Sequence, residues 1–246
     1  LYIMDIEERD EFNAVVTSSA DQSVSPTFTT NAFKNRNLDT SFAAAYFPNV
    51  QLELSNGSST LVPPSIAALS ALAQNDSQAH PWIAPAGTTR GILPRVLQLG
   101  TSFANGTLVD NLYEADINPI VNYQGYGHVV WGQKTLLQNQ SSLDRINVRR
   151  LLIDVKRKVR NVANTLLFEP NRQETLEKFT RLVTPILADV KAGRGVNRFK
   201  VIIDSSTTTQ ADIENNTIRG KAFLEPTAAA EFISLDFVVT NAGATI

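Results

Sequence analysis

The chain has 246 residues, of which 43% are hydrophobic and 19% are charged, and its formal net charge is -2. Such a composition is that of a globular protein with enough apolar residues for a sizeable core. Cysteine is absent and histidine occurs twice, which excludes disulfides, cysteine-ligated metals and a three-histidine metal site. No apolar run approaches the roughly 18 residues of a membrane-spanning helix, and the start lacks a signal-peptide layout. We therefore expect no membrane insertion. Because the chain begins at Leu1, we also expect it to be a piece of a longer protein.

The first hundred residues predict an α/β arrangement. An apolar run over residues 1–6 predicts a strand, and the polar, Ser/Thr-rich stretch that follows to about Asp39 predicts a loop. Residues 41–54 have a buried-strand pattern that Pro48 bends or ends, and Asn56-Gly57 predicts a turn. The segment at 62–76 then predicts a helix with a stripe of small apolar residues. The members of this stripe are Ala67, Ala68, Ala71 and Leu72.

The second half predicts two helices and a mostly antiparallel sheet. A long amphipathic helix is predicted over 143–168, because apolar residues recur there at spacings of three and four. The stripe consists of Val148, Leu151, Val155, Val159, Val162 and Leu166. A second helix is predicted over 173–191, bent or divided by Pro185 and stopped by Gly193. Strands are predicted at 198–204, 221–226 and 231–240. The fold class is therefore mixed: an α/β layer followed by an α+β region.

Charge is unevenly distributed along the chain. Residues 143–200 hold 14 Lys/Arg and 6 Asp/Glu, a balance of +8, which leaves -10 for the remainder. This split favours either nonspecific binding of nucleic acid or stacking of a basic face on the acidic face of another copy. The basic cluster at Arg157, Lys158 and Arg160 is read as a solvated helix face or as a contact for an acidic partner.

One segment comes close to a nucleotide-binding motif. Residues 127–135 read GHVVWGQKT, in which Gln133 separates the glycine from the lysine of a phosphate-binding loop. Val129, Val130 and Trp131 prefer an extended strand to a loop curled around phosphate. A nucleotide-binding domain built on Gly127–Thr135 remains the alternative function from a different class.

The two histidines do not indicate a catalytic site. A hydrolase triad would need His80 or His128 beside a nucleophile and a carboxylate. His80 lies in a predicted loop, and His128 lies at a strand edge among apolar neighbours, where a hydrogen-bonded packing role is expected. We therefore predict no enzymatic activity, no catalytic residues, no metal and no cofactor.

Several blocks of the sequence together carry a resemblance to a known family. They are SFAAAYF at 41–47, VPPS at 62–65, HPWIAPAGTTRG at 80–91, LYEADINPIV at 112–121, WGQKTL at 131–136, SLDRINVRRLL at 142–152, LFEPN at 167–171 and KAFLEPTAAAEFISLDFVVT at 221–240. In order and spacing these blocks resemble those of bacteriophage contractile tail sheath proteins. The resemblance covers about residues 41–242, whereas residues 1–40 match poorly.

The resemblance implies a structural protein with two parts. Residues 1–110 would form an α/β region related to a subtilisin-like layer, without its catalytic triad, and residues 111–246 a C-terminal α+β domain nearest the tail tube. Subunits of this family polymerise as stacked rings around the tube and contract to drive it through the host envelope. The implied partners are neighbouring sheath subunits, the tail tube protein and the baseplate, with no specific nucleic acid. The implied location is the virion tail, after assembly in the host cytoplasm.

Two segments are the candidate assembly contacts. One is the basic cluster Arg157, Lys158 and Arg160, and the other is the strand that holds Asp236, Phe237, Val238 and Val239, which either joins a neighbour's sheet or pairs within this chain. A related alternative is the sheath of a bacterial contractile injection system, which uses a similar fold.

Overall fold

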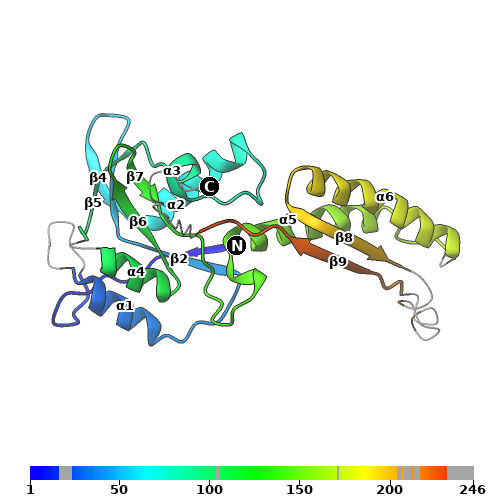
Figure 1. The fold of residues 1–246 in the computed structure, drawn as a ribbon, viewed down its shortest axis with the longest axis horizontal. Helices are drawn as coiled ribbons and strands as arrows, with labels where there is room; N and C mark the ends of the chain where they lie inside the picture. Colours follow the sequence, from blue (N-terminus) through cyan, green and yellow to red (C-terminus); the bar gives the residue numbers. More distant parts are fainter. Residues whose placement is uncertain are drawn as a thin grey trace, which may run out of the picture.

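The computed structural model describes residues 1–16, 24–103, 106–170, 172–203, 207, 212 and 217–231. The described chain forms a larger lobe and a smaller, elongated lobe, and one long helix runs from the first into the second (Figure 1). None of the helices in this described part is both long enough and apolar enough to cross a membrane.

A four-stranded sheet forms the centre of the larger lobe. Its order is β1 (Tyr2–Met4), β2 (Ala43–Phe47), β6 (Ile117–Tyr123) and β7 (Gly127–Val130). β1, β2 and β6 pair in parallel, and β6 and β7 form an antiparallel hairpin. The predicted strand at residues 1–6 is therefore present.

Helices cover both faces of this sheet, which explains why β2 is apolar throughout. Ala44 and Tyr46 of β2 face a core that includes α2 (Pro64–Gln78), while Ala45 and Phe47 face the opposite core. That second core includes α1 (Pro26–Lys34) and α4 (Gly106–Glu114). A strand buried on both faces reads as a continuous apolar run instead of an alternating one. The predicted small-residue stripe of α2 is buried as expected.

A second, three-stranded antiparallel sheet lies beside the first. Its order is β4 (Ser59–Val62), β3 (Val50–Glu53) and β5 (Val96–Leu99), and the short helix α3 (Gly87–Arg90) precedes β5. The predicted turn at Asn56-Gly57 connects β3 to β4, and Gly57 has a φ of +80°, a backbone conformation that glycine adopts without steric cost.

The smaller lobe consists of two helices and a hairpin, as the periodicity predicts. A short 3₁₀ turn (Ser142–Asp144) leads into α5 (Ile146–Asn164), which is followed by α6 (Gln173–Ala192). β8 (Val196–Ile202) and β9 (Lys221–Pro226) pair antiparallel. Four members of the predicted stripe, Leu151, Val155, Val159 and Val162, lie in a core that α6, β8 and β9 share. The other two, Val148 and Leu166, are also buried. The predicted strand at 231–240 lies outside the described residues, apart from Glu231.

Helix α5 belongs to both lobes. Its first residue, Ile146, is fully buried in a core of the larger lobe, and Arg149 donates from Nε to the carbonyl oxygen of Ser41 (3.1 Å). Arg150 pairs with Asp76 of α2. From Leu151 onward the buried side chains of the same helix pack in the core of the smaller lobe.

Trp82 makes a second connection between the lobes. It follows α2 in the larger lobe, yet its ring is 5% exposed and belongs to the core of the smaller lobe. Its Nε1–H donates to the carbonyl oxygen of Gly193 at 2.8 Å. A Cβ on Gly195 would lie 3.0 Å from Trp82 Cδ1 and 2.8 Å from Val190 Cγ1, so only glycine lets the backbone approach the ring this closely.

Two expectations from the sequence need correction. The polar stretch before Asp39 contains helix α1, with Pro26 at its first turn, so it is not loop throughout. The division at residue 110 does not coincide with a division between the lobes, because β6 pairs with β2 and β7 pairs with β6. The chain passes from one lobe to the other within α5 instead.

Replacing Trp82 with Ala should lower the free energy of unfolding by about 3–5 kcal/mol, because a buried ring is lost and a cavity remains. Trp131→Ala is the control, since Trp131 is 41% exposed on the larger lobe, and it should cost less than about 1 kcal/mol. Urea unfolding measures both variants. Equal losses would show that Trp82 does not connect the two cores.

Glu8 is a buried carboxylate in the segment after β1. One of its oxygens accepts the backbone N–H of Asn49 at 2.8 Å, just before β3. Burial raises the pKa of Glu8 above its usual value of 4.5, although the hydrogen bonds from Asn49 act in the opposite direction. The folded protein therefore holds this proton more tightly than the unfolded chain does.

Glu8 should make the fold less stable as the pH rises. A raised folded-state pKa stabilises the protein below the unfolded pKa, and this stabilisation is lost as the pH rises through the folded pKa. The stability of Glu8→Gln relative to the unmodified protein should therefore increase between about pH 4 and 7 in urea titrations. Glu7→Gln, at a neighbouring exposed position, is the control for the loss of one negative charge. A Glu8→Gln difference that stays constant with pH would contradict this account.

Candidate assembly surfaces

The structure gives Arg157 and Lys158 a shared acidic partner on their own helix. Arg157 Nη2 lies 2.7 Å from Oδ1 of Asp154, and Lys158 Nζ lies 2.8 Å from Oδ2. The Asp154 side chain is only 7% exposed, whereas that of Arg157 is 72% exposed. The spacings of three and four residues place all three side chains on one helix face. These two basic residues therefore neutralise a buried carboxylate as well as facing solvent.

Lys158 also reaches the connection between the lobes. Its Nζ lies 5.4 Å from the centre of the Trp82 ring, and His80 stacks on the same ring with centroids 4.5 Å apart. A cation over an indole ring is attracted by the negative charge of the ring face. The expectation that this cluster is only a solvated face is thus incomplete for Lys158.

Arg160 and Lys156 are the basic residues of α5 that face outward freely. Both are exposed, and within the described part of the chain neither forms an ion pair. Between residues 165 and 200, five further basic residues of the described chain share these properties: Arg172, Arg181, Lys191, Arg194 and Lys200. The positive charge that the sequence shows for residues 143–200 is therefore partly available to a partner.

The turn between α5 and α6 carries an apolar surface that the sequence analysis missed. Leu167 and Phe168 are exposed there, and Phe168 is fully so, with a φ of +68°. They border a hollow of about 720 Å³ that apolar side chains of α5, α6, β8 and β9 line. The sequence contains a signal for this apolar surface, because two large apolar residues follow Leu166, the last member of the predicted stripe.

The other candidate contact cannot be placed. Asp236, Phe237, Val238 and Val239 lie outside the described residues. Glu231 is the last described residue.

The segment 127–135 does not form a phosphate-binding loop. Its first half is strand β7, and the N–H of Val130 donates to the carbonyl oxygen of Gly91 at 2.8 Å. Lys134 is engaged by the protein, because its Nζ donates to the carbonyl oxygen of Tyr113 (2.7 Å) and pairs with Asp116 (3.2 Å). The structure agrees with the extended conformation that the sequence predicts here.

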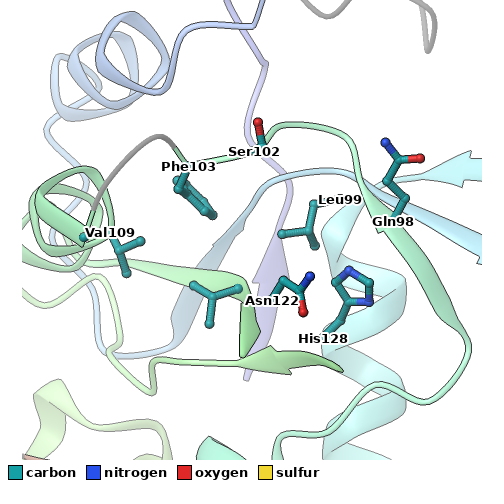
Figure 2. Close-up of a pocket in the computed structure, with 9 residues that line it drawn as sticks. Gln98, Leu99, Ser102, Phe103, Val109, Asn122 and His128 are labelled. Atoms are coloured by element: carbon teal, nitrogen blue, oxygen red, sulfur yellow. The ribbon is translucent and has the colours of Figure 1, made fainter. Parts of the chain in front are cut away.

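His128 lines a hollow of about 450 Å³ between β5, α4 and the β6–β7 hairpin. Figure 2 shows His128 and Asn122 near Leu99, with Phe103 and Val109 farther along the hollow. The Nδ1 atom of His128 lies 3.0 Å from the carbonyl oxygen of Val96, which is the hydrogen-bonded packing role that we expect. No group of three metal-ligating side chains comes together among the described residues.

Sequence comparison identifies relatives that are named tail sheath proteins. The tail sheath protein of Vibrio phage KVP40 is 34% identical over 172 residues, and that of Enterobacteria phage T4 is 32% identical over 172 residues. Each match covers 70% of this chain and 26% of the relative, so the chain spans about a quarter of their length. No protein-family model matches the sequence.

Solved structures of contractile assemblies share the fold. The sheath complex of the PVC extracellular contractile injection system, in its contracted state, has a TM-score of 0.75 and 25% identity, covering 87% of this chain and 59% of that chain. The contracted baseplate of the anti-feeding prophage contains a chain with a TM-score of 0.73 and 26% identity, covering 97% of this chain and 64% of that one. The predicted resemblance is confirmed: this chain is a relative of the tail sheath proteins of contractile tails.

Proposed function

We propose that the chain is part of a structural subunit of a contractile phage tail sheath. In this role it polymerises as stacked rings around a tail tube and contracts to drive the tube through the host envelope. The observation that carries the proposal is that one solved chain matches both lobes. That solved chain belongs to the contracted baseplate of the anti-feeding prophage, and the match covers 97% of the present chain. The sequence relatives named tail sheath protein support the same role.

The proposed role is non-enzymatic. The residues that suggested chemistry have structural tasks: Lys134 joins the segment that follows β7 to the end of α4, and His128 joins β7 to β5. These contacts support a packing role for both side chains.

We assign the partners by surface. The exposed basic residues of the smaller lobe would meet an acidic surface of a neighbouring subunit or of the tail tube, and the smaller lobe would lie nearest the tube. The baseplate is the further partner, and the assembled location is the virion tail, after assembly in the host cytoplasm. We also propose a subtilisin-like relationship for the α/β layer, which the helices on both faces of its parallel strands support.

The alternative is the sheath of a bacterial contractile injection system. The solved sheath complex that matches at 25% identity belongs to an extracellular contractile injection system. The sequence relatives at 32–34% identity belong to phages, and this higher identity favours the phage tail.

Charge reversal of Lys156 and Arg160 to Glu should impair polymerisation of the full-length protein and leave the stability of the 246-residue chain nearly unchanged. These two residues are exposed, whereas reversing Arg157 or Lys158 would place another carboxylate beside the buried Asp154 and destabilise the subunit. Electron microscopy would count the tubes that each variant forms. Polymerisation of the unmodified protein should also weaken between about 0.1 M and about 1 M salt, because the Debye length falls from about 10 Å to about 3 Å.

The matched control reverses Lys34 and Arg90, which are exposed basic residues of the larger lobe. It changes the net charge by the same amount and should leave polymerisation intact. Normal tubes from the Lys156/Arg160 variant at both salt concentrations would exclude this basic face as a contact. A full-length protein that forms no tubes under any condition would contradict the sheath proposal itself.

A further inference from the structure

After β9 the chain leaves the smaller lobe and returns to the larger one, where Glu231 is the last described residue (Figure 1). Thr227 is still bound to the smaller lobe, because its N–H donates to the carbonyl oxygen of Gly195 at 3.1 Å and its hydroxyl donates to Asn197 at 3.0 Å. Three alanines, residues 228–230, then bridge to Glu231. Such short side chains bury little apolar area, so they add little to the attachment.

Three separate parts of the larger lobe hold the carboxylate of Glu231. Tyr113 Oη at the end of α4 donates to Oε2 at 2.7 Å. Gln133 Nε2 and Arg145 Nε donate to Oε1 at 3.0 Å and 2.7 Å. The Glu231 side chain is 15% exposed, and hydrogen bonds to an ionised group shielded from water are stronger than neutral, exposed ones.

The donors are themselves held in place. The carbonyl oxygen of Gln133 accepts the N–H of Ile146 at 2.8 Å, which ties it to the start of α5. Arg145 also pairs with Asp144 at 3.1 Å, and Lys134 Nζ lies 4.5 Å from the centre of the Tyr113 ring. The binding site for the carboxylate is therefore rigid before the returning chain reaches it.

The pKa values of Tyr113 and Arg145 suit their role as donors in this site. Burial, followed by the hydrogen bond and the charge of Glu231, raises the pKa of the Tyr113 hydroxyl, so it keeps its proton. Burial acts to lower the pKa of Arg145, but the Glu231 carboxylate and its acidic neighbours outweigh this, and the net pKa is raised.

We propose that Glu231 is a positioning residue: its carboxylate, clamped by Tyr113, Gln133 and Arg145, fixes on the larger lobe the point at which the C-terminal segment begins. The proposal rests on the sheath function above, in which the strand containing Asp236 is a candidate contact between subunits. A segment that starts from a fixed point reaches its partner with a smaller loss of conformational entropy than one that starts from a loose tether.

The local test is NMR relaxation of the backbone amides in the 246-residue chain. Glu231→Gln removes the charge, and Tyr113→Phe removes one donor and leaves Glu231 in place. The order parameters of residues 228–231 should fall from about 0.85 towards about 0.6 in Glu231→Gln and less in Tyr113→Phe, while those of β2 and β6 stay unchanged. The control is Glu225→Gln, because Glu225 forms an exposed pair with Arg198 on the same chain segment.

The functional test uses the same variants in the full-length protein. Polymerisation should slow most in Glu231→Gln and less in Tyr113→Phe. Glu225→Gln should polymerise as fast as the unmodified protein. Unchanged order parameters at residues 228–231, or polymerisation of Glu231→Gln at the unmodified rate, would overturn the positioning role. Failure of the unmodified protein to polymerise would instead overturn the proposed function, and the order parameters would still test whether the clamp exists.

Discussion

The structure depends on one helix that is buried in two cores at once. The first turns of α5 are held by the larger lobe through Ile146, Arg149 and Arg150, and its later turns supply the core of the smaller lobe. An α-helix is stiff over this length, so neither lobe can rotate without breaking buried contacts at one end of it. Trp82 and Glu231 repeat this connection with two other segments of the chain.

This rigidity suits a subunit that must change its neighbours without changing its fold. Contraction of a lattice requires two sets of contacts between subunits that differ by a modest free energy. A body whose lobes are coupled at three places transmits a movement of one surface to the other. The exposed features of the smaller lobe lie at its periphery: they are its basic side chains and the Leu167–Phe168 turn.

Much of the fold follows from local patterns in the sequence. The stripes of α2, α5 and α6 and the strands β8 and β9 were predictable from their regular spacing of apolar residues. Strand β2 was predictable because a strand buried on both faces is a continuous apolar run. Helix α1 was missed because its buried face contains Thr29 and Thr30 beside the single large residue Phe33. The pairing of Asp154 with Lys158 was predictable, because the two residues are four positions apart on one helix. The contacts of Glu231 were not predictable, because its donors lie up to 118 positions away and no local pattern connects them. The same limit applies to the pairing of β6 with β2, which sets the boundary between the lobes.

Native-state hydrogen exchange along α5 tests most directly whether the lobes form one body. If they do, slowly exchanging amides near Ile146 and near Val159 should open with the same free energy, and with the same dependence on urea, because both require global unfolding. The amides of β2 and β6 should share that value. A lower opening free energy for the second half of α5, with α6 and β8, would mean that the smaller lobe unfolds by itself, and it would contradict the rigid subunit described here.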